Sequence, residues 1–417
     1  MSKQSYKINP ILQFLVNIWM LIYVKKYRVT TDITPEVSQL NEPYLLLSNH
    51  VGRFDPFILY HHLAKAPHFI SSDAILRDRV IGTIFKLLGA LPIKKGTRDS
   101  QIIREMAKVI QSGNALALFP EGARTWTGQT GYFDPSIVKL VRLLKVPVIT
   151  TVIRGVYMSD PRWGNGMRKS AMHIEYKLAF RPEDVKALTD EQIYETIKRN
   201  LQHDDVAYQR DRLIRLDSEK RAEFIEFICF QCPSCQSFDG FDSKGNDFTC
   251  RNCSSTNHVD EFGFLTNQEG NALEIDNTRD WVNWQNKNFA RYIQREIKQN
   301  NSGKLFSSKK MHLEFAVGYE KMQSLGEGML HFYSDRIEVV GAEKTEVLPI
   351  SEISALTAQF KERIELFYQD KAYRFTSVAA KESGMKWEVA INTTWLEKDQ
   401  SIKISPSFKE LIEAIKA

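Results

Sequence analysis

Residues 44–56 read YLLLSNHVGRFDP, and this stretch decides the fold of the first half of the chain. Tyr44–Asn49 is a short apolar run typical of a buried strand, and Asp55-Pro56 suits the first turn of a helix. His50 and Asp55 therefore flank one tight strand-to-helix loop. Ligand sites of open α/β sheets lie at the carboxyl ends of such strands, so this loop is the first candidate site.

Strand-like and helix-like segments alternate from about residue 40 to residue 200, which predicts an α/β domain with a mixed sheet flanked by helices. Further strands are expected at Ala115–Phe119, Val146–Val152 and Met172–Leu178, and helices at Ile75–Leu88, Ser100–Ser112, Ile137–Leu144 and Asp190–Arg221.

A second strand-end motif is Phe119-Pro120-Glu121-Gly122-Ala123-Arg124, which follows an apolar run. The glycine lets the backbone approach a ligand closely. The planar guanidinium of Arg124 matches the geometry of a phosphate group. Glu121 can accept a hydrogen bond from a substrate hydroxyl or orient Arg124.

The spacing of His50 and Asp55 suits general-base chemistry. A carboxylate beside a histidine fixes its tautomer and stabilises the imidazolium that forms when the ring takes a proton. Each residue also has an ordinary explanation, because Asp55 can cap a helix before Pro56 and His50 can be a loop histidine bonded to backbone. The motif alone favours those explanations, and the second strand-end motif shifts the balance toward a site.

Together the two motifs resemble those of the glycerolipid acyltransferase family, most closely the 1-acyl-glycerol-3-phosphate (lysophosphatidic acid) acyltransferases. The family's asparagine-histidine-four-residues-aspartate block is matched by Asn49, His50 and Asp55, its phenylalanine-proline-glutamate-glycine block by Phe119–Gly122, its phosphate-binding arginine by Arg124, and a later valine-proline block by Val146–Ile149. The resemblance covers about residues 35–200. Lys95, or Lys94, stands where the family has an arginine, and a lysine keeps the charge but loses the bidentate geometry.

The resemblance implies an enzyme that transfers an acyl chain from a thioester to the free hydroxyl of 1-acyl-glycerol-3-phosphate, giving phosphatidate. His50 would be the general base and Asp55 its partner, and the acceptor would be bound by Arg53, Lys95, Glu121, Gly122 and Arg124. The donor would be acyl-CoA or an acyl-carrier protein, with no redox or organic cofactor. The helix at Ile75–Leu88 is expected either to line an acyl channel or to pack in the core.

Two other functions stay open. One is an acyltransferase for another lysophospholipid or for glycerol phosphate. The other is a non-catalytic membrane protein that binds lipid.

Five cysteines lie within residues 229–253, and four of them form the pattern Cys232-x2-Cys235-x14-Cys250-x2-Cys253. Two short pairs supply four thiolates, which is typical of structural zinc in a zinc ribbon. Cys229 is outside the pattern and is expected to be a packed thiol. Residues 201–250 carry 6 basic and 10 acidic side chains, which argues against a nucleic-acid partner.

Short strand-like runs follow one another beyond residue 310, the last at Trp387–Asn392, before an amphipathic helix at Phe408–Lys416. They predict a β-barrel-like (PH-like) domain with a C-terminal helix. A further strand is expected at Val259–Phe264. The expected division is a membrane-interface helix (1–30), an acyltransferase domain (31–225), a zinc ribbon (226–265), a helical linker (266–310) and the β-rich domain (311–417).

The N-terminal segment is expected to be a helix capped by Asn9, with an apolar run over Ile11–Val24. At about 1.5 Å per residue the run reaches about 21 Å, short of the roughly 30 Å hydrocarbon core of a bilayer. Residues 1–200 carry 28 basic and 17 acidic side chains. This profile favours a peripheral or monotopic position on the cytoplasmic face of the cell membrane; the alternative is a helix docked on its own domain.

Overall fold

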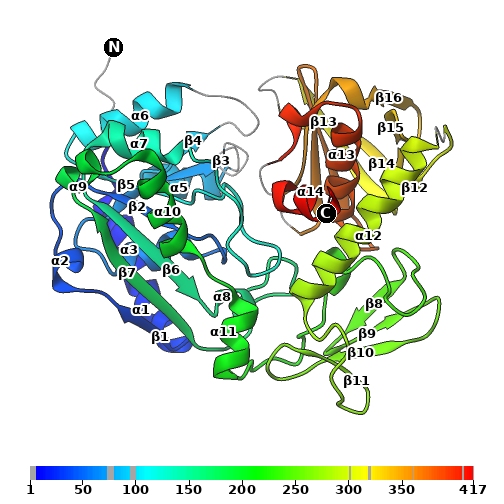
Figure 1. Ribbon diagram of the computed structural model, residues 1–417, viewed down its shortest axis with the longest axis horizontal. Helices are drawn as coiled ribbons and strands as arrows, with labels where there is room; N and C mark the ends of the chain where they lie inside the picture. The colour runs from blue at the N-terminus through cyan, green and yellow to red at the C-terminus, as the bar shows by residue number, and fades with distance from the viewer. Residues whose placement is uncertain are drawn as a thin grey trace. The chain divides into compact units, whose positions relative to one another are not determined.

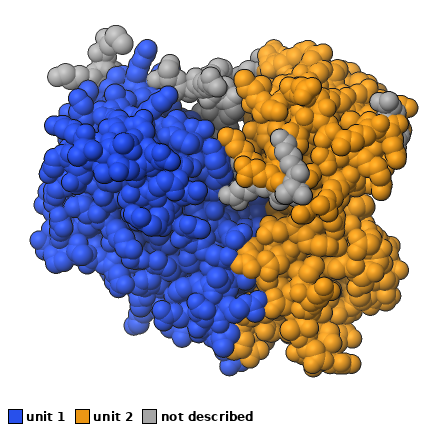
Figure 2. Space-filling model, in the orientation of Figure 1, with its two compact units in different colours: residues 1–161, 167–217 blue, residues 162–166, 218–417 orange. Residues whose placement is uncertain are grey.

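The computed structural model describes residues 6–72, 79–93, 100–299, 302–317, 321–359, 361–405 and 408–416. The chain forms two compact units, the first of residues 1–161 and 167–217 and the second of residues 162–166 and 218–417 (Figure 2). Among the described residues, no helix is both long enough and apolar enough to cross a membrane. The bounds of the five segments expected from the sequence stay predictions.

The first unit is built on a seven-stranded mixed sheet (Figure 1). Its strands are β1 (Val29–Asp32), β2 (Leu45–Ser48), β3 (Pro67–Ser72), β4 (Leu91–Ile93), β5 (Ala115–Leu118), β6 (Val148–Arg154) and β7 (Met172–Phe180). Their order is β1-β7-β6-β2-β5-β3-β4, and all neighbours are parallel except β6 and β7. The predicted mixed α/β sheet is confirmed.

Helices flank this sheet. They are α1 (Pro10–Lys26), α2 (Pro35–Ser38), α3 (Asp55–His61), α5 (Ile81–Leu87), α6 (Ser100–Gln111), α7 (Ile137–Leu144), α8 (Val156–Ser159), α9 (Pro182–Ala187), α10 (Asp190–Leu201) and α11 (Asp205–Arg212). Helices α6, α7 and α10 share a hydrophobic core with Leu45 and Leu47 of β2. Leu46 is equally buried, and because alternate side chains of a strand point to opposite faces, the other face of β2 is covered as well.

The topology decides where loops can meet. Strand β2 lies between β5 and β6 and is parallel to both. The carboxyl ends of these three strands therefore share one edge of the sheet, where a ligand site of an open α/β sheet is expected.

The second unit contains two antiparallel sheets. The smaller has β8 (Phe241–Lys244), β9 (Asp247–Cys250), β10 (Thr256–Val259) and β11 (Leu265–Asn267). The larger has β12 (Phe306–Ser307), β13 (Met311–Val317), β14 (Gln323–Phe332), β15 (Arg336–Val340), β16 (Thr345–Pro349), β17 (Ile353–Gln359), β18 (Arg363–Tyr368) and β19 (Lys371–Ser377). Helix α13 (Gly384–Glu397) packs against α12 (Thr278–Lys298) and β17, and α14 (Lys409–Lys416) packs on α12. An antiparallel, β-rich C-terminal region is thus confirmed.

Three predicted elements are wrong. Trp387–Asn392 lies within α13, which is buried along most of its length; a fully buried helix has no polar face and resembles a buried strand in sequence. Val259–Phe264 is interrupted by a turn, in which the Asp260 side chain accepts hydrogen bonds from two following backbone N–H groups. Asp190–Arg221 forms two helices, and the second ends before Leu213, whose φ of 48° is left-handed.

The predicted helix at Ile75–Leu88 is described only in part. Helix α5 covers Ile81–Leu87, and residues 73–78 lie outside the described residues.

Candidate active site

His50 and Asp55 lie at the two ends of the loop between β2 and α3, and they contact each other directly. The distance between His50 Nδ1 and Asp55 Oδ2 is 2.9 Å. Asp55 is completely buried and also accepts hydrogen bonds from the backbone N–H groups of Val51 (2.7 Å) and Gly52 (2.9 Å). A carboxylate at Nδ1 draws the ring proton to that nitrogen, so Nε2 is the atom that can take a proton from a substrate.

Packing explains the sequence of this loop. A Cβ at Gly52 would come within 2.5 Å of Val156 Cγ1, so a larger residue would force α8 away from the loop. The buried side chain of Asn49 bonds both backbone groups of Ile153 in β6, accepting from its N–H at 2.8 Å and donating to its C=O at 3.0 Å. These contacts fix the loop against the neighbouring strand.

Glu121 links the two sequence motifs through the backbone. Its Oε1 accepts a hydrogen bond from His50 N–H (2.8 Å) and its Oε2 accepts one from Gly131 N–H (2.7 Å). A further bond runs from Thr125 N–H to the His50 carbonyl (2.9 Å). Gly122 has a φ of +72°, a left-handed conformation that favours glycine. The structure gives both predicted residues a role in shaping the loops, and their contact with an acceptor stays a prediction.

Arg53 and Arg124 meet at the buried carboxylate of Asp160, which belongs to neither sequence motif. Arg53 donates to it through Nε (2.9 Å), Nη2 (2.5 Å) and its backbone N–H (3.0 Å). Arg124 Nη1 lies 3.6 Å from Asp160 Oδ2. The exposed fraction of the side chain is 1% for Asp160, 18% for Arg124 and 42% for Arg53. The only sequence signal for Asp160 was its position in the segment after β6, because the two motifs likewise come after β2 and β5.

Burial lowers the pKa of the Arg124 guanidinium, and the charges of Asp160 and Asp55 oppose this effect. Arginine is the most basic of the side chains, so Arg124 keeps its charge under such conditions. Lys95, which was also predicted to bind the acceptor, lies outside the described residues.

An apolar pocket adjoins the site behind three stacked rings. The His50 ring stacks on Phe119 with centroids 4.0 Å apart, and Phe119 stacks on Phe69 at 5.9 Å. Phe69 lines the pocket together with residues from α1, α3, β3, α5 and the segment that follows α5: Val16, Pro56, Phe57, Tyr60, Pro67, Phe85, Leu88 and Ala90. Two of these, Phe85 and Leu88, belong to the segment expected either to line an acyl channel or to pack in the core.

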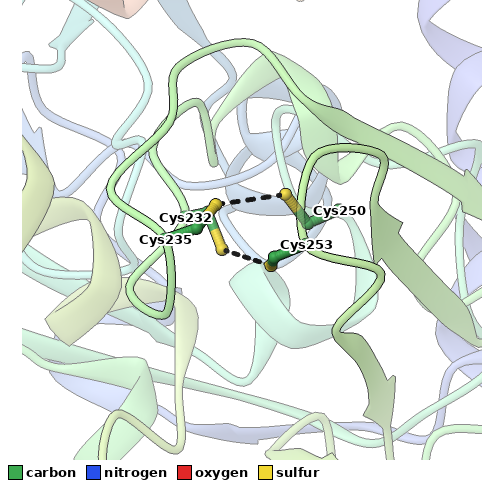
Figure 3. Close-up of side chains that lie close together, drawn as sticks. All are labelled: Cys232, Cys235, Cys250 and Cys253. Carbon is green, nitrogen blue, oxygen red and sulfur yellow. Dashed lines mark hydrogen bonds between the residues drawn. The ribbon is translucent and has the colours of Figure 1, made fainter.

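The four cysteines of the zinc pattern gather in the second unit, where their sulfur atoms face one another (Figure 3). All four sulfurs lie within 4.8 Å of one another, and the Cys232–Cys253 and Cys235–Cys250 distances are both 3.8 Å. Four Zn–S bonds of about 2.3 Å in a tetrahedron hold the sulfurs about 3.8 Å apart, so this spacing fits a zinc ion. Cys229 is a buried free thiol, as predicted.

Comparison with known families bears on the first unit. Residues 28–154 match the family model described as "Acyltransferase". The matched region contains His50, Asp55 and the motif at residues 119–124, and it ends before Asp160. Residues 28–154 are therefore similar to the domain that this family model describes, in agreement with the resemblance of the two motifs.

Named relatives agree with this assignment. The chain is 28% identical over 192 residues to a probable 1-acyl-sn-glycerol-3-phosphate acyltransferase of Mycoplasma genitalium, covering 42% of this chain and 69% of that protein. It is 25% identical over 158 residues to the chloroplastic 1-acyl-sn-glycerol-3-phosphate acyltransferase BAT2 of Brassica napus, covering 37% and 45%. The chain thus spans about half the length of several curated relatives that it matches.

A similar solved structure is the 1-acyl-sn-glycerophosphate (LPA) acyltransferase PlsC from Thermotoga maritima. The alignment has a TM-score of 0.39 and 16% sequence identity, and it covers 45% of this chain and 78% of that one.

Proposed function

We propose that the protein transfers an acyl chain from a thioester to the free hydroxyl of 1-acyl-glycerol-3-phosphate, giving phosphatidate. The observation that carries the proposal is the pairing of His50 with Asp55 on a loop that also bears Arg53 and that Glu121 connects to the loop of Arg124. The family match over residues 28–154 supports the reaction class, and the names of the curated relatives support the acceptor.

In the proposed reaction, His50 Nε2 takes the proton of the acceptor hydroxyl while the hydroxyl oxygen attacks the thioester carbonyl. The ester C–O bond forms, the C–S bond breaks, and the proton on the imidazolium passes to the leaving thiolate. Asp55 stabilises the imidazolium from the Nδ1 side. The acceptor is itself the nucleophile, so no acyl-enzyme intermediate is needed. The donor is acyl-CoA or an acyl-carrier protein.

The acceptor phosphate is assigned to Arg124 and Arg53, with Lys95 as a third cation. Guanidinium groups donate two parallel hydrogen bonds to phosphate, and such charge-assisted bonds are strong where water is partly excluded. Glu121 and Gly122 then position the glycerol by holding the loop at residues 119–131 against His50.

The apolar pocket is proposed to hold part of the acyl chain. Its lining is hydrocarbon and aromatic, and the stack His50–Phe119–Phe69 joins it to the proposed base. An acyl chain seated there would bring its thioester carbonyl toward the edge of the sheet that carries His50.

Helix α1 supports a membrane-bound enzyme. Asn9 caps it as predicted, accepting hydrogen bonds from two backbone N–H groups, and Met20 and Tyr23 are buried against the domain. The helix also exposes large apolar side chains, with exposed fractions from 38% to 72%: Ile11, Phe14, Leu15, Ile18, Trp19, Leu21 and Ile22. A docked helix with an apolar outer face, ended by Lys25 and Lys26, suits a membrane interface. We place it on the cytoplasmic face of the cell membrane.

A structural zinc ion is proposed for Cys232, Cys235, Cys250 and Cys253. The completely buried ammonium of Lys386 in α13 lies 2.6 Å from Asp239, in the segment between the two cysteine pairs, and 2.9 Å from Glu382. Zinc would therefore stabilise α13 as well as the ribbon. The antiparallel sheet followed by α13 supports the PH-like assignment of the last domain, which remains a proposal.

The test is an acyl-transfer assay with purified protein, both donor types, and a panel of lysophosphatidate, other lysophospholipids and glycerol 3-phosphate. We expect the highest kcat/KM with lysophosphatidate. His50→Ala should lower the rate by about 10²–10⁴-fold, because a positioned base is lost. His173→Ala is the matched control, since His173 lies 3.4 Å from Asp32 on the same unit. Near-wild-type turnover of His50→Ala would sink the mechanism, and transfer to none of the acceptors would favour a lipid-binding role.

A further inference from the structure

We propose that Asp160 is a positioning residue for the acceptor phosphate: it holds Arg53 and Arg124 in the arrangement that receives a phosphate monoester. The inference rests on the proposed acceptor. Asp160 belongs to neither sequence motif and lies beyond the region that matches the family model, residues 28–154.

The backbone fixes the place of this carboxylate. Asp160 directly follows α8, and its N–H donates to the Val156 carbonyl at 2.7 Å. Val156 packs against Gly52, at the position where no side chain fits. These contacts hold the short helix against the loop that carries Arg53, and the carboxylate of Asp160 therefore lies beside that loop.

Asp160 in turn orders Arg53. Three donors of this arginine converge on the carboxylate, two from the guanidinium and one from the backbone. Arg53 is the more exposed of the two arginines, and without this partner its long side chain would sample many rotamers. An arginine that is already ordered loses less conformational entropy when it binds phosphate.

Asp160 also balances charge at Arg124. A guanidinium that is mostly buried requires a nearby counter-charge, and Asp160 supplies it at 3.6 Å. The two arginines and Asp160 together keep a net charge of +1. This charge attracts a phosphate, whereas an uncharged head group gains no such attraction. Because the carboxylate occupies the Nε and Nη2 donors of Arg53, an incoming phosphate must use the remaining donors of the pair. Recognition of the acceptor therefore requires its phosphate to lie at the position that these remaining donors define.

The experiment compares Asp160→Asn with wild type and with Glu175→Gln, a control that removes the carboxylate partner of another arginine in the same unit (Arg154 Nη2 to Glu175 Oε2, 2.6 Å). Steady-state assays give KM and kcat for lysophosphatidate, for monoacylglycerol as the acceptor without phosphate, and for the thioester. Calorimetry measures binding of glycerol 3-phosphate, with glycerol as the blank. Thermal unfolding of each variant measures the folded state.

We expect Asp160→Asn to raise the KM for lysophosphatidate about tenfold, with the thioester KM unchanged, since charge-assisted bonds that order Arg53 are lost. The preference for lysophosphatidate over monoacylglycerol should fall by a similar factor, and Glu175→Gln should change neither. An unchanged acceptor KM, or an equal loss with both acceptors, would overturn the inference.

Two further measurements test the proposal if Asp160→Asn does not fold or if wild type transfers no acyl chain. If Asp160→Asn does not fold, the double variant Arg53→Gln/Asp160→Asn removes the unpaired charge and is compared with Arg53→Gln alone. Because Asp160 also holds Arg124, the double variant should lose more of the phosphate preference than Arg53→Gln, and an equal loss would overturn the inference. If wild type transfers no acyl chain to lysophosphatidate, the proposed function fails. The inference about Asp160 then stands if wild type binds glycerol 3-phosphate and Asp160→Asn does not. The inference falls if wild type does not bind glycerol 3-phosphate.

Discussion

Replacing Asp55 with asparagine would separate the charge of this side chain from its hydrogen bonds. Asp55 Oδ2 accepts hydrogen bonds from Val51 N–H at 2.7 Å, Gly52 N–H at 2.9 Å and His50 Nδ1 at 2.9 Å. The two backbone donors require an acceptor at this position, so the amide of Asp55→Asn should turn its carbonyl oxygen toward them. The proton then stays on His50 Nδ1, and the negative charge is the main loss.

The size of the effect follows from this geometry. A hydrogen bond to a charged group contributes about 1.5–3 kcal/mol, and one between neutral groups about 0.5–1.5 kcal/mol. In the proposed reaction, the imidazolium of the transition state therefore loses about 1–2 kcal/mol of stabilisation, which should lower kcat about 5- to 30-fold. The new NH₂ group would face Gly52 N–H, where Asp55 Oδ1 accepts at 2.9 Å, so the free energy of unfolding should fall by about 1–3 kcal/mol.

Steady-state kinetics and urea unfolding of Asp55→Asn, Asp55→Ala and His50→Ala would check these values. Asp55→Ala leaves two backbone N–H groups without an acceptor and should lower the free energy of unfolding the most. A loss of kcat in Asp55→Asn as large as in His50→Ala would refute the orientation imposed by the backbone donors. An unchanged kcat would refute the stabilisation of the imidazolium by Asp55.

Three other outcomes are expected. Arg124→Ala should raise the KM for lysophosphatidate at least about tenfold and leave the thioester KM nearly unchanged, because Arg124 is assigned to the phosphate alone; equal effects on both substrates would contradict that assignment. Elemental analysis should find one zinc ion per chain, which Cys250→Ser should lose and Cys229→Ala should keep. Removal of the zinc by a chelator should lower the unfolding temperature of the second unit. A metal content far below one per chain would count against the site. Leu15→Asp should weaken flotation with anionic vesicles about tenfold, because a leucine buried in the membrane contributes about 1.5–3 kcal/mol to binding. Leu143→Asp is the control and should not weaken flotation, although Leu143 is 51% exposed and Leu15 is 54% exposed. Equal flotation of the two variants would exclude α1 as the anchor.

Local pattern was enough for much of the fold. The apolar runs before Asn49 and Phe119 became β2 and β5, and the predicted helix at Ile137–Leu144 has those same ends in the structure. In these elements the pattern of apolar residues along the sequence matches the pattern of buried side chains, which short-range sequence patterns predict well. Helix α13 was missed because it is buried nearly all round, and its sequence therefore lacks a polar face.

The His50–Asp55 contact was also predictable, because the two residues are close in sequence and share one strand-to-helix loop. The four cysteines are also close in sequence, since each pair lies in its own tight turn and only 14 residues separate the two pairs. In both cases the chain between the partners is short, and few backbone paths connect them.

Only the tertiary structure showed that Asp160 stands between Arg53 and Arg124. Arg53 and Asp160 are 107 residues apart, and nothing in the local sequence joins them. They meet because β6 lies beside β2, an order set by how the whole sheet buries its apolar faces. The sequence by itself determined that His50, Asp55 and Arg124 lie directly after or close to the ends of buried strands. The strand order decided which of them share a site, because side-chain contacts over such separations depend on the complete packing of the sheet.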